Sequence, residues 1–112
     1  MSGVIEIRTY RAQAGRREEL TELLEARVFP LHRETGIRVL GVFPSAEDSD
    51  TLVWLRAFPD ADSRDAMTKA LYGSKEWTDE LAGVVLPLIA DHTAVLLDDT
   101  PSLLSRWPEP AA

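Results

Sequence analysis

Cysteine is absent from this chain of 112 residues, and its absence removes several kinds of site at once. Disulfides, thiolate nucleophiles and cysteine-ligated zinc are all excluded, and nothing points to an oxidising compartment. The chain also lacks any apolar run near the roughly 20 residues that a membrane span needs. The first residues do not show the charged-then-apolar pattern of a signal peptide. We therefore expect a cytoplasmic protein with no membrane partner.

Motifs for cofactors and covalent catalysis are missing as well. There is no glycine-rich phosphate loop and no nucleophile elbow, which argues against nucleotide binding and covalent hydrolysis. The two histidines, His32 and His92, stand far apart, and no acidic residues beside them have the spacing of metal ligands. We expect no metal and no cofactor.

Basic residues are scarce. The chain has 12 lysines and arginines but 19 acidic residues, which gives a formal net charge of −7. Such a charge repels phosphate backbones and anionic membranes, so nucleic acid is not an expected partner. The length suits one compact domain with one core.

The hydrophobic pattern predicts seven elements of secondary structure. Runs of β-branched and aromatic residues predict strands at residues 4–11, 37–43, 51–58 and 92–97. Apolar residues at helical spacing predict helices at residues 16–34, 60–72 and 74–88. Pro30 and Pro87 should kink or end the first and third of these helices.

The order of these elements indicates an α+β fold. Strand–helix–strand followed by strand–helix–strand, with the second helix split, is the ferredoxin-like βαββαβ arrangement, in which both helical layers cover one face of an antiparallel four-stranded sheet. We assign residues 1–98 to this domain. Residues 99–112 form a polar, proline-rich tail with no pattern of a packed element.

Alternation along the strands divides their residues between the two faces of the sheet. If the aliphatic residues of the first and third strands face the helices, the opposite face carries a mixed aromatic and charged set: Glu6, Arg8, Tyr10, Leu52, Trp54, Arg56 and Phe58. That face is too apolar to remain in water, so we expect a second copy of the chain to cover it, sheet against sheet. The alternative is the opposite assignment, with Trp54 and Phe58 in the helix-packed core and Val53 and Leu55 outside.

Six stretches of the chain carry a family resemblance: EIRTY at 6–10, AGRREEL at 14–20, LVWLRAF at 52–58, SRDAMTKAL at 63–71, KEWTDEL at 75–81 and VVLPLI at 84–89. In their order and spacing they resemble the NIPSNAP family. The family is a branch of the dimeric α/β-barrel superfamily, which also holds cofactor-free monooxygenases, muconolactone-isomerase-like and haem-degrading proteins. The resemblance implies a ferredoxin-like fold and a homodimer whose two sheets form a barrel. It also implies a pocket inside that barrel or between sheet and helices, but no particular reaction.

Arg8 and Arg56 are the strongest candidates for ligand binding. A guanidinium held between aromatic walls, here Trp54 and Phe58, is a fixed donor for a carboxylate, enolate or phenolate. Glu6 lies two residues from Arg8 on the same face and is a candidate general base. The alternative is a structural ion pair between Glu6 and one of the arginines across the strands.

Tyr10 and His32 complete the candidate set. Tyr10 is a candidate proton donor beside Glu6. An analogy with the haem-binding members of the superfamily makes His32 a candidate axial or ligand-binding residue. The alternative is a histidine at a helix end, where it interacts with the helix dipole.

Two functions remain open from the sequence. In the first, the dimer binds a small aromatic or anionic metabolite in its barrel cavity, or transforms it by cofactor-free isomerisation or oxygenation. In the second, the barrel is filled by its own side chains, and the protein is a non-enzymatic dimeric interaction module.

Overall fold

A computed structural model describes residues 3–108 of the chain. Its single sheet has the order β2-β3-β1-β4 and is antiparallel throughout. The strands are β1 (Val4–Ala12), β2 (Arg38–Pro44), β3 (Thr51–Phe58) and β4 (Ile89–Asp98). The two central strands, β1 and β3, are thus those that carry the candidate residues.

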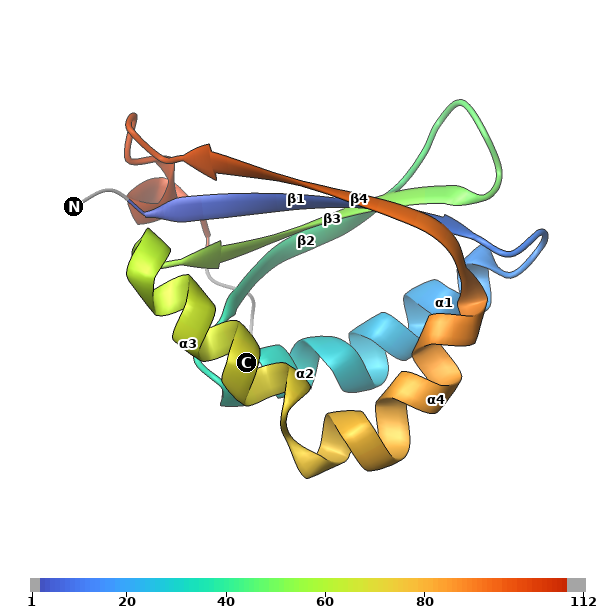
Figure 1. Cartoon of the computed structure of the whole chain (residues 1–112). Coiled ribbons are helices and arrows are strands. Elements are labelled where there is room, and N and C mark those ends of the chain that lie inside the picture. Colours follow the sequence, from blue (N-terminus) through green and yellow to red (C-terminus); the bar gives the residue numbers. More distant parts are fainter. Residues whose placement is uncertain (1–2, 109–112) are drawn as a thin grey trace.

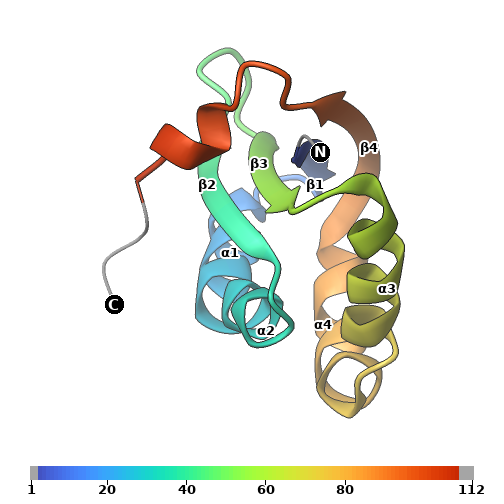
Figure 2. The same cartoon turned by 90° about the vertical axis from the view of Figure 1, so that its left-hand side faces the viewer.

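The helices lie together on one face of the sheet in two groups (Figures 1 and 2). The first group follows β1 and comprises α1 (Arg17–Leu23), the π-helical turn η1 (Leu24–Val28) and α2 (Phe29–Glu34). The second group comprises α3 (Ala61–Tyr72), the π-helical turn η2 (Glu76–Leu81), α4 (Ala82–Val85) and the 3₁₀ turn η3 (Leu86–Leu88). This arrangement confirms the ferredoxin-like α+β fold predicted from the order of elements.

The two prolines act differently on their helices. Pro30 is in the first turn of α2, where its missing N–H costs little, and the helix continues to Glu34. The irregularity precedes it as the turn η1, which absorbs the change in hydrogen bonding. Pro87 lies in η3, and the helix ends there before β4 begins at Ile89.

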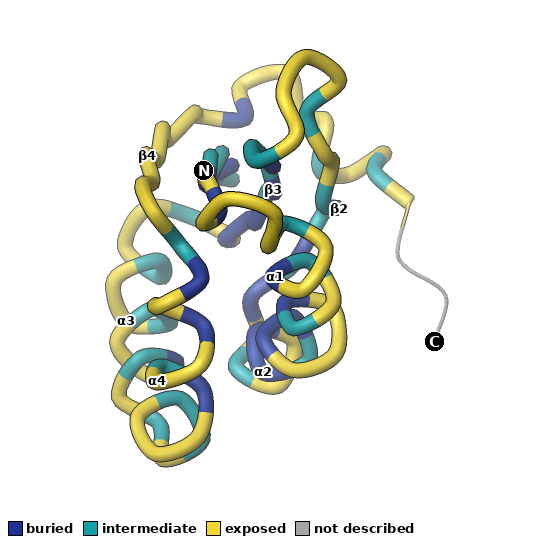
Figure 3. The backbone as a smooth tube through the Cα atoms, turned by 90° about the vertical axis from the view of Figure 1, so that its right-hand side faces the viewer, coloured by how far each residue is buried: buried dark blue, intermediate teal, exposed yellow. Residues whose placement is uncertain are grey.

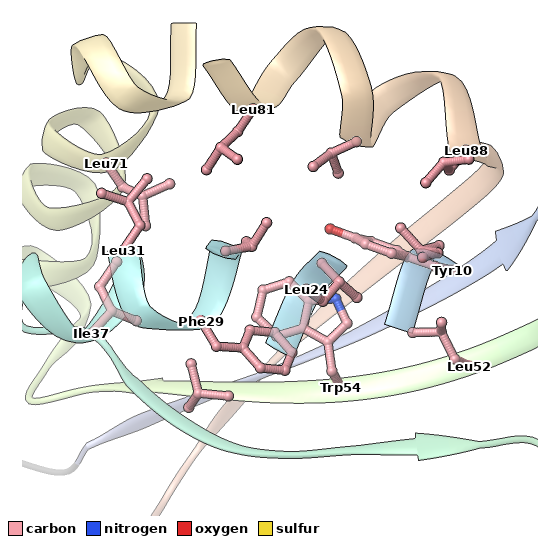
Figure 4. Packing of buried hydrophobic residues seen from close by; sticks show 14 of the residues in the cluster. Tyr10, Leu24, Phe29, Leu31, Ile37, Leu52, Trp54, Leu71, Leu81 and Leu88 are labelled. Carbon is pink, nitrogen blue, oxygen red and sulfur yellow. The ribbon is translucent and has the colours of Figure 1, made fainter. Parts of the chain in front are cut away.

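The assignment of the sheet faces made from the sequence was wrong. Tyr10, Leu52, Trp54 and Phe58 belong to the core cluster on the helix-covered face, where they pack with the buried leucines of the helices. Figure 4 shows Trp54 and Tyr10 extending from the strands toward the helices. The alternative assignment, with Val53 and Leu55 on the outer face, is therefore correct.

Side-chain volume explains this outcome. Both faces of the sheet are apolar, so alternation alone defines two sets of residues but cannot choose between them. On the helix-covered face, large rings such as those of Trp54 and Phe58 pack between the sheet and the helices with little exposure. The smaller aliphatic residues remain for the outer face.

The outer face of the sheet, which the two helical groups leave uncovered, is largely apolar, although Ile5 at one end of it is buried. The pairing of the strands places Ile7 directly beside Leu55 on one side and Val95 on the other. Val95 is 52% exposed and Phe43 is 50% exposed. We call this surface the open face: Ile5, Ile7, Phe43, Val53, Leu55, Val95 and Leu97.

The C-terminal segment packs against its own chain rather than extending as an unpacked appendage. The buried Asp99 accepts hydrogen bonds from the backbone N–H groups of Leu103 and Leu104, at 2.8 Å each, in a 3₁₀ turn, η4 (Leu103–Arg106). Arg38 of β2 donates to the carbonyl oxygens of Leu104 and Trp107. The tail expected at 99–112 is thus tied to β2 as far as Trp107, and residues 109–112 lie outside the described part.

Candidate functional site

A cluster of charged side chains lies between the sheet and the helices, with Glu6 at its centre. Glu6 and Arg56 are direct neighbours across β1 and β3, and both are buried. Arg56 donates to Oε2 of Glu6 from Nη2 at 2.9 Å and from Nε at 3.2 Å. The cross-strand ion pair that the sequence offered as an alternative is therefore present.

Two further arginines bond to the same carboxylate. Arg8, two residues along β1, donates from Nη1 to Oε2 of Glu6 at 2.6 Å. Arg64, in the first half of α3, donates from Nε to the other oxygen, Oε1, at 2.9 Å. Glu6 thus accepts hydrogen bonds from three guanidinium groups, and we call Glu6, Arg8, Arg56 and Arg64 the arginine cluster.

These hydrogen bonds and charges determine the ionisation of Glu6. Burial acts to raise its pKa, but the charge of Arg56 and the hydrogen bonds from Arg8 and Arg64 outweigh burial and hold the pKa below its ordinary value of 4.5. Glu6 therefore stays ionised at neutral pH. A carboxylate so strongly stabilised is a weak base, so the geometry favours a counter-ion. The role of general base stays a prediction.

His32 supports the cluster from the first helical group. Its Nδ1 lies 2.8 Å from the carbonyl oxygen of Val28, and its Nε2 lies 3.0 Å from Nη1 of Arg56. Because a carbonyl only accepts and a guanidinium only donates, the ring is neutral, with its proton on Nδ1. Burial, together with the charges of Arg56 and Arg8, lowers the pKa of His32 from 6.5 to about 4.

Both nitrogens of His32 are therefore engaged within the protein. The side chain is fully buried, so any effect on a ligand would act through Arg56, which it holds in place. Its expected part as a direct ligand-binding residue stays a prediction without support from this geometry.

Two tyrosine hydroxyls complete the polar site. Tyr10 accepts a hydrogen bond from Nε of Arg8 at 3.2 Å, and Tyr72 of α3 accepts one from Nη1 of Arg56 at 2.8 Å. Each phenol keeps its own hydrogen to donate. Burial raises the pKa of Tyr10 despite the charge of Arg8 beside it. Tyr10 therefore remains a protonated donor, as the candidate role requires.

Aromatic rings surround the guanidinium groups. The central carbon of Arg56 lies 5.5 Å from the ring centroid of Trp54 and 5.6 Å from those of Phe58 and Tyr72. Arg8 lies 5.6 Å from the Trp54 ring. These distances suit cation–π attraction. Trp54 and Phe58 thus flank the guanidinium groups on the helix-covered face, and their part in binding a ligand stays a prediction.

The cluster reaches solvent on the side of β4. The side chains of Arg8 and Arg64 are 15% and 28% exposed. Ala94 and Leu96 of β4 stand directly opposite Arg8 and Glu6 and so share the helix-covered face, yet both are exposed. Figure 3 shows most of β4 as exposed. Two exposed apolar side chains of β4 therefore stand beside the partly exposed Arg8.

Arg64 and Tyr72 were not among the residues predicted from the sequence. Both lie on α3, whose apolar stripe is weak, with Leu71 its only buried residue among those described. Arg64 precedes the buried Leu71 by seven residues, so the two share one face of the helix. This spacing is the one sequence feature that could have indicated that Arg64 points toward the interior. His92, the second histidine, has an exposed side chain, and its ring centroid lies 6.2 Å from that of Tyr10.

Two other findings bear on the kind of site. Within residues 3–108, no group of three or more histidine, aspartate or glutamate side chains is arranged to hold a metal ion. Among the described helices, none combines the length and the apolar character that crossing a bilayer demands. The site is one of arginines, tyrosines and aromatic walls.

Solved structures share this fold at low identity. An uncharacterised NIPSNAP domain protein from Burkholderia xenovorans is 21% identical, with a TM-score of 0.75 over 84% of this chain and 91% of its own. A NIPSNAP family protein of unknown function from Agrobacterium tumefaciens is 20% identical, with a TM-score of 0.79 over 90% and 94% of the two chains. A putative antibiotic biosynthesis monooxygenase from Nitrosomonas europaea is 15% identical, with a TM-score of 0.70 over 88% and 91%.

The sequence itself gives the family. No match was found among curated proteins. The model of the NIPSNAP family, however, matches residues 5–101, which include all four strands but for the first residue of β1. The chain belongs to the NIPSNAP family.

Proposed function

We propose that the protein binds a small anionic metabolite with an apolar or aromatic body at the arginine cluster. The observation that carries this proposal is the convergence of three guanidinium groups on one carboxylate, in a protein whose net charge is −7. Buried charges are ordinarily paired, so an excess of cations at a partly open site favours an anion.

The exposed apolar side chains of β4 support the apolar part of the ligand. Ala94 is the cross-strand neighbour of Arg8, and Leu96 is that of Glu6. The side chain of Leu96 is 50% exposed. A ring or short hydrocarbon body on these side chains would place its acidic group toward Arg8. The proposed site thus lies between sheet and helices, and not between two sheets as the sequence led us to expect.

The same groups suit a proton-transfer reaction without a cofactor. A positive site stabilises an enolate or phenolate, and Tyr10 remains protonated beside Arg8. Returning a proton to an enolate is one step of an isomerisation. We therefore include isomerisation in the proposal: Glu6 would take a proton from one carbon of the substrate, and Tyr10 would return a proton to the enolate at another carbon and be reprotonated from Glu6. Oxygenation of a bound enolate by molecular oxygen would use the same stabilisation.

We also propose that the protein is a homodimer closed through the open face. Its apolar residues are continuous across all four strands. An apolar surface of this kind is removed from water when the same surface of a second copy packs over it about a twofold axis. Such an interface would fill the space between the sheets with aliphatic side chains and leave the arginine clusters outside it.

Calorimetric titration with benzoate tests the binding proposal. We expect saturable heat with the native protein and at least an approximately tenfold weaker affinity in Arg8→Met, because one charged hydrogen-bond donor is lost. Arg33→Met removes an exposed arginine of α2 and should bind as the native protein does. Equal affinity in Arg8→Met would overturn the proposed site.

A further inference from the structure

The three arginines of the cluster differ in how their charges are compensated. Arg56 is fully buried and makes two bonds to Glu6, so these two residues form a neutral pair inside the protein. Arg8 and Arg64 also donate hydrogen bonds to this carboxylate, whose single negative charge Arg56 already balances. Their two charges are therefore in excess of the one negative charge that the cluster supplies.

No other described carboxylate neutralises these two arginines. Within residues 3–108, the one further ion pair of Arg8, Arg56 or Arg64 joins Nη1 of Arg64 to Asp65 at 3.6 Å. The Asp65 side chain is 84% exposed, and an exposed pair of this kind contributes little because water screens it. The excess at Arg8 and Arg64 thus remains about two charges.

Each of the two arginines keeps one donor atom that these bonds do not use. Arg8 uses Nε and Nη1, and Arg64 uses Nε and the distant Nη1 contact. Among the described hydrogen bonds, the Nη2 atom of each makes none. Because Arg8 and Arg64 bond to the two oxygens of one carboxylate, their guanidinium groups are neighbours around Glu6.

From this charge balance we infer that the ligand carries two acidic groups on a compact apolar or aromatic body, one for Arg8 and one for Arg64. The inference rests on the proposed function and specifies the class of its ligand. A ligand with one acidic group would leave one guanidinium of the partly buried cluster without a counter-ion. A diacid would neutralise both, and its body would lie against Ala94 and Leu96.

The aromatic rings do not replace a second acidic group. A cation–π contact attracts a guanidinium but leaves its charge in place. A charged hydrogen bond to a carboxylate is stronger than one between neutral groups. The second acidic group should therefore strengthen binding by about tenfold or more.

The test compares benzoate with its three ring diacids, phthalate, isophthalate and terephthalate, by calorimetry at constant ionic strength. We expect the best of the three diacids to bind the native protein about tenfold or more tightly than benzoate. In Arg64→Gln this preference should fall to about twofold or less, because one of the two cations is gone. Arg33→Gln, the matched change at an exposed arginine, should keep the preference.

The outcomes separate this inference from the proposed function. If benzoate and the diacids bind the native protein equally well, the ligand has one acidic group and the diacid inference is overturned, while anion binding stands. If none of the four compounds binds, both are overturned. Should Arg64→Gln not fold, as judged by circular dichroism, Arg8→Gln removes the other cation and must abolish the preference in the same way.

Discussion

Nη2 of Arg56 lies 2.9 Å from Oε2 of Glu6, its direct neighbour across β1 and β3. This contact makes a neutral pair in the interior, to which Arg8 and Arg64 add two partly exposed cations. The pair therefore serves as the anchor of the cluster, and the two added arginines are the binding groups in the function that we propose.

Replacing Glu6 by glutamine should strongly destabilise the protein. The change leaves the buried Arg56 without its counter-ion, and breaking a buried pair costs about 3–5 kcal/mol. Urea denaturation measures the free energy of unfolding. Glu25→Gln, at an exposed glutamate, is the control and should change stability by less than about 0.5 kcal/mol. A similarly small effect at Glu6 would contradict the anchor role.

His32 should make stability depend on pH in mildly acidic solution. Its pKa is about 4 in the folded protein against 6.5 ordinarily. Between these values the unfolded chain takes up a proton that the folded protein does not. The free energy of unfolding therefore falls as pH decreases through this window, by about 3 kcal/mol in total. The lowered pKa of Glu6 causes a further loss only below about 4.5.

The two histidines provide a matched comparison for this effect. His32→Gln keeps an acceptor for Arg56 but does not titrate, so its stability should vary less between pH 6.5 and 4. His92→Gln, at the exposed histidine of β4, should retain the native slope. If His32→Gln and the native protein show the same slope, the buried neutral histidine is not its source.

A charge on the open face should separate the proposed dimer. Val95→Asp places a carboxylate among apolar residues that would face a second copy, and burying it unpaired costs several kcal/mol. Light scattering should give the mass of two chains for the native protein and of one for the variant. Leu86→Asp, at a leucine of η3 that is 55% exposed, should remain a dimer. A native protein with the mass of one chain contradicts the dimer proposal.

Asp99 should control the order of the C-terminal segment. Its carboxylate accepts from the N–H groups of Leu103 and Leu104, and losing such a cap costs about 1 kcal/mol. In Asp99→Ala, hydrogen exchange at these two amides should accelerate. Asp98→Ala changes the adjacent exposed aspartate and should leave their exchange unaltered. Unchanged protection in Asp99→Ala would show that the cap does not hold η4.

The sequence predicted the elements and the pairing of the site residues because both follow from local patterns. Alternation placed Glu6, Arg8 and Tyr10 on one face of β1, and the antiparallel neighbours β1 and β3 brought Arg56 beside them. Which face the helices cover depends on how side-chain volumes fill the space beneath the sheet. Two apolar faces gave no periodic signal for that choice, and the assignment was wrong.

The part that α3 plays in the site could not be predicted from the sequence, for a different reason. Arg64 and Tyr72 reach Glu6 and Arg56 across 58 and 16 residues of chain, respectively. Such contacts depend on how a helix docks on the sheet. An arginine and a tyrosine on a mostly exposed helix are typical of any protein surface.

Nuclear magnetic resonance of the arginine Nε–Hε groups tests the central claim most directly, because it shows where a ligand binds. When isophthalate is added to the native protein, the signals of Arg8 and Arg64 should shift with the same affinity that calorimetry gives. The signals of Arg33 and Arg38 should stay in place. If calorimetry detects binding while the Arg8 and Arg64 signals do not move, the ligand lies elsewhere and the arginine cluster is not its site.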